Sequence, residues 1–331
     1  CQFMGIGAYY LNIVLLVFNE LLPMKSRITA LFAASAVLGT AIFITSCGGG
    51  GSGVGGTNGG TNGGGPSILP PAPDPVCNAN KDVTASSQAN LNQPGVLVPE
   101  STRERAGDIG KYAHTNHLIW IGGGTGRAKS PQGITPAQLR AAYSIPDQAG
   151  SGAIAIVDAH SYPTALNDFN VFSTEFGLPT EPSSDPTADT NNVPQIVYAS
   201  GNEPTPDAGW AQEMALDIQW AHAVAPRAKI YLVQADSAKL SDLMEAVDLA
   251  KTLPGVRQVS MSFGATEFAC GYVGYDRVMV QQGVTFYAAS GDTSGERDFP
   301  ALSKNAICVG GTTLQLKPNG TRDNVNVWGS T

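Results

Sequence analysis

Charged residues are scarce in this chain, and cationic ones are scarcer than anionic ones. Only 14% of its 331 residues are charged, and 19 Lys and Arg face 27 Asp and Glu, for a formal net charge of −8. A nucleic-acid-binding surface needs clustered cations, so the composition argues against such a partner. The 42% of hydrophobic residues suffices for one large domain with a sizeable core, and nothing suggests a coiled coil or a disordered polymer.

Histidine is rarer still, with four residues in the whole chain. Two of them, His114 and His117, lie in "HTNH". A zinc site needs a third ligand, and two isolated histidines are more often incidental. We therefore expect no metal site in this chain.

The N-terminal region has the pattern of an export signal. Met24 is a better start than Cys1, because "MKSRITALFAASAVLGTAIFITSC" supplies two cations, an apolar run over 28–44 and small residues before Cys47. Residues 1–23 then form an upstream extension absent from the mature protein, and 24–46 form the signal peptide.

"ITSC" resembles the bacterial lipobox, in which the Cys after the cleavage point receives a diacylglycerol. A transmembrane anchor of similar length is the alternative. The Gly-rich tether at 47–66 favours the lipoprotein, because it would hold a domain off the membrane. We expect an exported bacterial lipoprotein of the cell envelope or surface, or a secreted protein, with the membrane as partner through lipidated Cys47.

Cysteine is also rare, with five residues. Cys77, Cys270 and Cys308 remain for an exported, oxidising setting, which allows one disulfide and one thiol. Their pairing cannot be read from the sequence. Cys308 lies in the apolar run "AICVGG", so we expect it in the core.

The chain pattern changes after an irregular lead-in at 67–132 that is rich in Pro, Asn and Ser. Short continuous apolar runs then alternate with helical stretches, which predicts an α/β fold with a parallel sheet and helices on both faces. The predicted strands are 153–157, 195–199, 229–234, 258–262, 285–289 and 306–309. The predicted helices are 162–177, 210–226, 238–253 and 275–283.

Ligand-binding and catalytic residues in such folds lie at the carboxyl ends of the strands. Asp158 follows the first predicted strand, Phe263 and Gly264 follow "VSMS", and Asp292 follows "TFYAASG". We expect these residues to meet at one edge of the sheet.

The predicted helix "WAQEMALDIQWAHAVAP" carries two acids, Glu213 and Asp217, but no broad polar face. Four residues apart, they lie about 40° apart around the helix axis. Two carboxyls close together in low-dielectric surroundings cannot both ionise cheaply, so the pair should hold a proton and titrate as a unit. The alternative interpretation is that the acids meet solvent, cap backbone amides, or pair with Arg227 or Lys229.

Several motifs resemble the sedolisins, or serine-carboxyl peptidases of the kumamolisin type, which have a subtilisin-like fold. They are "GITPAQLRAAYSIP", "EMALDIQWAHAVAPRAKIYLV", "SMSFG", "AASGDTSGE" and "FPALSKNAICVGGTTL", in this order along the chain. The resemblance identifies 133–331 as a partial sedolisin-like peptidase domain, incomplete at the C-terminus. It implies polypeptide substrates.

This resemblance also implies roles for individual residues. Glu213 would be the general base for a serine nucleophile, Asp217 would support it, and Asp292 would line the oxyanion hole. A carboxylate base still accepts a proton at acid pH, and Asp292 can donate to an oxyanion only when it is protonated. Asp158 matches an acid that extends the proton network of some members towards the tryptophan of a Ser-Trp-Gly turn, where this chain has Phe263.

The family's nucleophile lies in a Gly-Thr-Ser motif beyond the "VGGTT" strand, and its calcium site lies later still. After Gly311 the only serine is Ser330, which lies at the terminus with no following helix. We therefore expect no nucleophile and no metal in this chain, a calcium site beyond Thr331, and an inactive fragment. The stretch between the Gly-rich tether and "GITPAQ" is also short for the long N-terminal pro-domain of the family.

Competing functions lack their own motifs. A subtilisin-type Asp-His-Ser enzyme needs a His-Gly-Thr-like helix start, and an esterase needs Gly-x-Ser-x-Gly after a strand. "GGGTG" at 122–126 is not promptly followed by the helix that a nucleotide site requires. The remaining alternative is an inactive surface lipoprotein that retains a peptide-binding cleft.

Overall fold

The computed structural model describes residues 96–105, 107–115, 117, 119–120, 133–267, 274–292 and 298–327. The expected signal peptide, Cys47, the tether, Cys77 and Cys270 lie outside these ranges. Within the described ranges, every helix is too short or too polar to span a bilayer.

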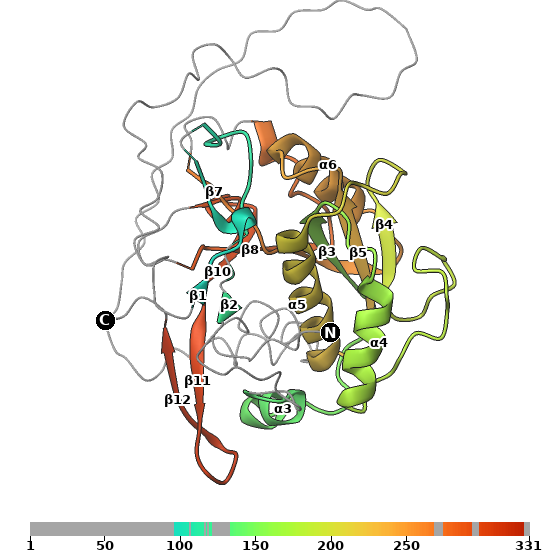
Figure 1. Cartoon of the computed structure of the whole chain (residues 1–331), viewed down its shortest axis with the longest axis vertical. Helices are drawn as coiled ribbons and strands as arrows, with labels where there is room; N and C mark the ends of the chain where they lie inside the picture. The colour runs from blue at the N-terminus through green and yellow to red at the C-terminus, as the bar shows by residue number, and fades with distance from the viewer. Residues whose placement is uncertain are drawn as a thin grey trace, which may run out of the picture. The chain divides into compact units, whose positions relative to one another are not determined.

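A six-stranded parallel sheet forms the centre of the fold (Figure 1). The strand order is β10-β8-β6-β3-β5-β4, so β3 lies between β5 and β6. All six strands coincide with predicted ones, and the predicted α/β class with a parallel sheet is confirmed. The strands are β3 (Ala153–Ala159), β4 (Gln195–Tyr198), β5 (Lys229–Ala235), β6 (Val256–Met261), β8 (Thr285–Ala289) and β10 (Ala306–Val309).

Four α-helices accompany the sheet. They are α3 (Pro136–Tyr143), α4 (Ala165–Glu175), α5 (Ala208–Val224) and α6 (Leu240–Ala250). The predicted helix at 275–283 is wrong, since 276–279 form turns. The cause is a long-range contact: the Ser303 hydroxyl donates to the Asp276 carboxylate at 2.6 Å, and the Asn305 side-chain amide donates to the Asp276 backbone carbonyl at 2.8 Å. These contacts hold that carbonyl outside a helical ladder.

Short elements complete the described chain. The lead-in contains β1 (Val96–Leu97), the 3-10 turn η2 (Glu100–Thr102) and β2 (Ile119–Trp120), and β1 pairs with β2. Together with β1–β2, three antiparallel strand pairs of the described residues lie outside the main sheet. The other two join β7 (Ala265–Thr266) to β9 (Asp298–Phe299) and β11 (Thr312–Leu316) to β12 (Arg322–Val327).

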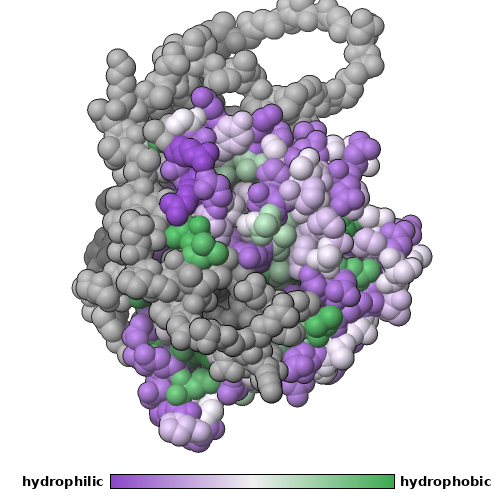
Figure 2. Space-filling view, in the orientation of Figure 1, coloured by the Kyte–Doolittle hydropathy of each residue, from purple (hydrophilic) through white to green (hydrophobic). Residues whose placement is uncertain are grey.

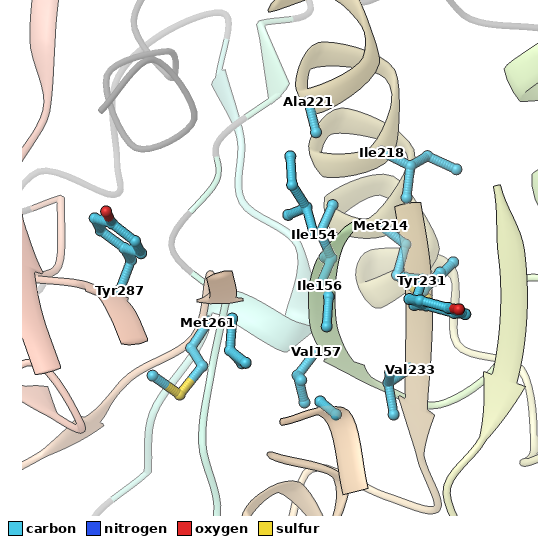
Figure 3. Packing of buried hydrophobic residues seen from close by; sticks show 14 of the residues in the cluster. Ile154, Ile156, Val157, Met214, Ile218, Ala221, Tyr231, Val233, Met261 and Tyr287 are labelled. Atoms are coloured by element: carbon cyan, nitrogen blue, oxygen red, sulfur yellow. The ribbon is translucent and has the colours of Figure 1, made fainter. Parts of the chain in front are cut away.

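Helix α5 packs on one face of β3 and β5. Side chains alternate along a strand, so Ile154 and Ile156 share one face of β3. Figure 3 shows Met214 and Ile218 of α5 beside these isoleucines. Helix α6 packs on β3, β5 and β6. Every residue of β3 is buried, as a strand covered on both faces must be.

The outer side of α5 is covered as well, which explains why the helix has no polar face. It contacts α3 and α4 in addition to the sheet, and Figure 1 shows α4 beside it. Trp220 packs edge-on against Phe172 of α4, with ring centroids 6.0 Å apart. The Asp207 carboxylate caps the start of α5 by accepting from the amides of Gly209 and Trp210, each at 2.9 Å.

The expectation that Cys308 lies in the core is wrong. Its side chain is exposed, because β10 is an edge strand of the sheet. Ile307 beside it is 39% exposed. In the face shown in Figure 2, the described surface is otherwise mostly hydrophilic, with small apolar patches.

Candidate active site

Helix α5 brings Glu213 and Asp217 to the carboxyl edge of the sheet. The helix connects β4 to β5, so it begins near the carboxyl ends of the strands and runs back towards their amino ends. Glu213 lies in its first half, and Asp217 lies one turn later, just past the middle of the helix. Their exposed fractions are 6% and 4%, so the predicted burial of both acids is confirmed.

Asp158 completes a cluster of three buried acids. It has the same strand parity as Ile154 and Ile156, so it lies on the face of β3 that α5 covers. It is fully buried, and neither carboxyl oxygen has a hydrogen-bond partner among the described residues. Burial, reinforced by the nearby charges of Asp217 and Glu213, raises the pKa of Asp158 well above its usual value.

The pKa of Asp217 is raised in the same way. Burial is the main cause, the charge of Glu213 adds to it, and a hydrogen bond from Ser262 opposes it. Ser262 is the serine of "SMSFG", so the turn after β6 is tied directly to the acid cluster. At mildly acid pH, Asp158 and Asp217 therefore favour their neutral, proton-carrying forms.

Phe263 and Gly264 lie in that same turn. Phe263 is fully buried and belongs to the core. Gly264 forms an antiparallel bridge with His114 and lies under the buried side chain of Asp298. A Cβ atom at position 264 would lie 2.6 Å from Asp298 Oδ2, so this backbone approach requires glycine.

The substitution Gly264→Ala is therefore expected to lower the free energy of unfolding by about 1–3 kcal/mol, because Asp298 or the turn must move. Thermal unfolding measures the effect. Gly107→Ala is the matched control, since nothing lies within 4 Å of a Cβ atom there, and it should change stability by less than about 0.5 kcal/mol. Equal, small effects of the two substitutions would show that Asp298 does not confine position 264.

Asp292 lies three residues after β8, at the same edge of the sheet, and is half-buried. One strand, β6, separates β8 from β3. The amide of Ser290 donates to the carbonyl of Val309, which fixes the start of the loop that carries Asp292. The fold thus brings Asp292 to the edge that holds the acid cluster, on a separate loop.

His117 is a site residue that the sequence did not reveal. Its Nδ1 lies 2.7 Å from Glu213 Oε2, and its Nε2 lies 3.3 Å from Gln212 Oε1. His117 as a whole is 2% exposed. The interpretation of "HTNH" as incidental therefore misses this contact, and no local spacing signals it, because 96 positions separate the partners.

In the part of the chain that the structure describes, no three His, Cys, Asp or Glu side chains are grouped so that they could hold a metal ion. Among the described residues there is thus no cluster of carboxylates of the kind that calcium sites use. The resemblance assigns that ion to sequence beyond Thr331, and no step below depends on it.

Comparison with known proteins agrees with the fold described above. Residues 191–327, less than half of the chain, match the model of the subtilase family. Among solved structures, the fold is similar to Pseudomonas sedolisin, a serine-carboxyl proteinase determined in complex with two molecules of pseudo-iodotyrostatin. The TM-score is 0.51 at 22% identity, over 59% of this chain and 58% of that one. No curated protein sequence matches.

At this identity, the structural similarity establishes the fold, and the chain spans somewhat more than half of the length of that sedolisin. The subtilase match adds independent support from the sequence. The predicted resemblance is confirmed for the fold: the chain has a subtilisin-like fold similar to that of the sedolisin.

Proposed function

We propose that the full-length protein is a serine-carboxyl endopeptidase that cleaves polypeptides best at acid pH. The observation that supports this most is the burial of Glu213, Asp217 and Asp158 together at the carboxyl edge of the sheet. Burying three carboxyl groups lowers the stability of the fold, whereas acids on a solvent-exposed helix face would not. Buried acids with shifted pKa values are therefore more typical of functional sites. Its position in a subtilisin-like fold favours proton transfer over a structural role.

In the proposed reaction, Glu213 takes the proton of a serine hydroxyl as the serine oxygen attacks the carbonyl carbon of the peptide. Glu213 then returns the proton to the leaving nitrogen as the C–N bond breaks. Asp217, kept protonated by burial, supports Glu213, and Asp158 keeps a further proton beside Asp217. Protonated Asp292 donates a hydrogen bond to the oxyanion. The serine comes from the Gly-Thr-Ser motif that the resemblance places after residue 331.

A cleavage assay on the full-length gene product tests this function. The substrate is an unfolded, fluorescently labelled polypeptide, and kcat/KM is measured from about pH 3 to pH 8. We expect a maximum on the acid side, because neutral Asp217 and Asp292 are needed. A maximum at neutral or alkaline pH would contradict the proposed proton donors. Peptide binding without cleavage at any pH would favour the alternative, a binding lipoprotein that has lost catalysis.

We also propose that Cys47 anchors the protein to a membrane of the cell envelope through a lipid. The lipobox-like "ITSC" and the Gly-rich tether support this. The protein should partition into the detergent phase in a phase-separation assay, and Cys47→Ser should move it to the aqueous phase. Detergent partitioning that persists in Cys47→Ser would favour a transmembrane anchor.

A further inference from the structure

Gln234 is a buried polar residue in the apolar strand β5. It lies near the carboxyl end of the strand and is 1% exposed. Its backbone is paired with β3 on one side and β4 on the other, so its side chain must find partners of its own. A buried amide without such partners lowers the stability of a fold, so a glutamine at this position needs a physical explanation.

The register of the sheet places Gln234 beside Asp158. Strands β3 and β5 are parallel, and Asp158 is the direct partner of Gln234 in this pairing. Neighbouring strands lie about 4.8 Å apart, and paired residues point to the same face of the sheet. Asp158 lies on the face that α5 covers, so the Gln234 side chain enters the same space between sheet and helix.

A contact with Met214 of α5 orients the Gln234 amide. The Nε2 atom lies 3.4 Å from the Met214 sulfur. A thioether sulfur can only accept a hydrogen bond, so the NH₂ end of the amide is the end that faces it. The carbonyl oxygen, Oε1, is thereby left for another partner. It is buried and has no hydrogen-bond partner among the described residues.

Asp158 can supply the donor that this oxygen lacks. Both carboxyl oxygens of Asp158 are also buried without a partner in the described ranges. Two acceptors side by side repel each other, whereas a protonated carboxyl group carries an O–H that can donate to an amide oxygen. A proton on Asp158 therefore satisfies both groups, while an ionised Asp158 leaves both unsatisfied.

We propose that Gln234 is a positioning residue of the acid cluster, whose side-chain carbonyl accepts a hydrogen bond from the protonated carboxyl group of Asp158 and keeps Asp158 neutral. Gln234 carries no charge of its own. It therefore reinforces the effect of burial on Asp158 without adding a charge to the cluster.

The titratable groups around Asp158 come from α5 and from the lead-in. Asp217 and Glu213 of α5 act on Asp158 directly, and both favour its neutral form. His117 of the lead-in reaches the cluster through its contact with Glu213. After β6, the neighbour is the uncharged Ser262, which donates to Asp217. Charge and hydrogen bonding thus act on Asp158 in the same direction.

A neutral Asp158 has a consequence for catalysis, and this consequence alone rests on the proposed function. A negative charge on Asp158 would stabilise the protonated form of Glu213. A general base must be ionised before it can take a proton, so such a charge would confine Glu213 to higher pH. By keeping Asp158 neutral, Gln234 lets Glu213 act as a base at lower pH.

The test is a carboxyl titration by NMR of the full-length gene product, labelled with ¹³C at the side-chain carboxyl and amide carbons. Gln234→Met keeps an unbranched side chain of similar size but removes the acceptor. The apparent pKa of Asp158 should fall by about one pH unit, a tenfold loss in proton affinity that matches one net hydrogen bond. Gln258→Met is the matched control. Gln258 is 4% exposed and pairs with Ile154, four positions before Asp158, so this variant should leave that titration unchanged.

The signal of Gln234 itself gives a readout that does not depend on how a variant folds. In the unaltered protein, the ¹³C shift of its side-chain carbonyl should change in the same step as Asp158, and that of Gln258 should not. A Gln234 carbonyl that ignores this step would overturn the proposal. So would an unchanged or higher apparent pKa of Asp158 in Gln234→Met, because a higher value means that the amide donates to the ionised carboxylate. Neither measurement requires cleavage, so failure of the proposed function would be seen separately, in the cleavage assay.

Discussion

The substitution Glu213→Gln is expected to lower kcat/KM of the full-length gene product by about 10²–10⁴-fold, the usual contribution of a general base. The amide keeps the size of the side chain and an oxygen that can accept from His117, but it cannot take the serine proton. The cleavage assay at the acid optimum measures the loss. Asp217→Asn should also lower the rate, by a smaller factor, because Asp217 acts through Glu213.

Glu245→Gln is the matched control for these variants. Glu245 lies exposed on α6 and takes no part in the acid cluster, so its neutralisation should leave kcat/KM unchanged. Circular dichroism checks that all variants are folded. Activity that survives both Glu213→Gln and Asp217→Asn would remove the basis of the proposed mechanism.

The substitution Asp158→Asn is expected to stabilise the protein at neutral pH. The pKa of Asp158 is raised in the folded state, so the folded state binds the proton more tightly than the unfolded state does. Its contribution to stability is thus fully present below the unfolded pKa, near 3.8, and is lost as pH rises through the folded pKa. Asparagine stays neutral at every pH, so it avoids this loss.

The expected gain at neutral pH is about 1.4 kcal/mol for each pH unit by which the folded pKa of Asp158 exceeds the unfolded one. In a domain of this size that corresponds to about 2–4 °C in Tm for each kcal/mol. Thermal unfolding from pH 4 to pH 8 should show the two proteins converging at the acid end. Identical pH dependence of the variant and the parent would mean that Asp158 is not held neutral by burial.

Asp185→Asn provides a control of opposite sign. Asp185 is exposed, and hydrogen bonds from the Thr187 side chain and amide lower its pKa. Its stabilising contribution is present above the unfolded pKa and is lost as pH falls through the folded one. Neutralising it should therefore slightly reduce stability at neutral pH.

The sheet could be predicted because its strands are buried on both faces. Such strands read as continuous apolar runs, and "AIAIV" and "KIYLVQ" carry this pattern without interruption. The acid pair could be predicted for the same kind of reason, since two carboxyls interrupt an otherwise apolar helix. Even the facing of Asp158 towards α5 follows from strand parity once α5 is known to pack on Ile154 and Ile156.

Other features depend on contacts that the sequence does not encode locally. Exposure of Cys308 follows from the edge position of β10, and strand order is a property of the whole sheet. The failure of the helix at 275–283 depends on Ser303 and Asn305, which lie far along the chain.

The pairing of Ala113 and His114 with the loops after β5 and β6 is the largest feature that sequence reasoning missed. Ala113 and His114 are held by backbone bonds, which any residue except proline can make, so their identity carries no signal. His117 reaches Glu213 only because of that pairing. The lead-in is irregular in sequence, yet it lies against the residues proposed to carry the chemistry.

The most direct test of the account is a carboxyl titration. In protein labelled with ¹³C at the side-chain carboxyls, NMR follows Asp158, Asp217 and Glu213 as pH is varied. The account predicts that Asp158 and Asp217 titrate well above the usual aspartate range, in steps that also perturb the Glu213 signal. Independent titration of Asp158 and Asp217 near their ordinary values would contradict a buried, proton-sharing cluster.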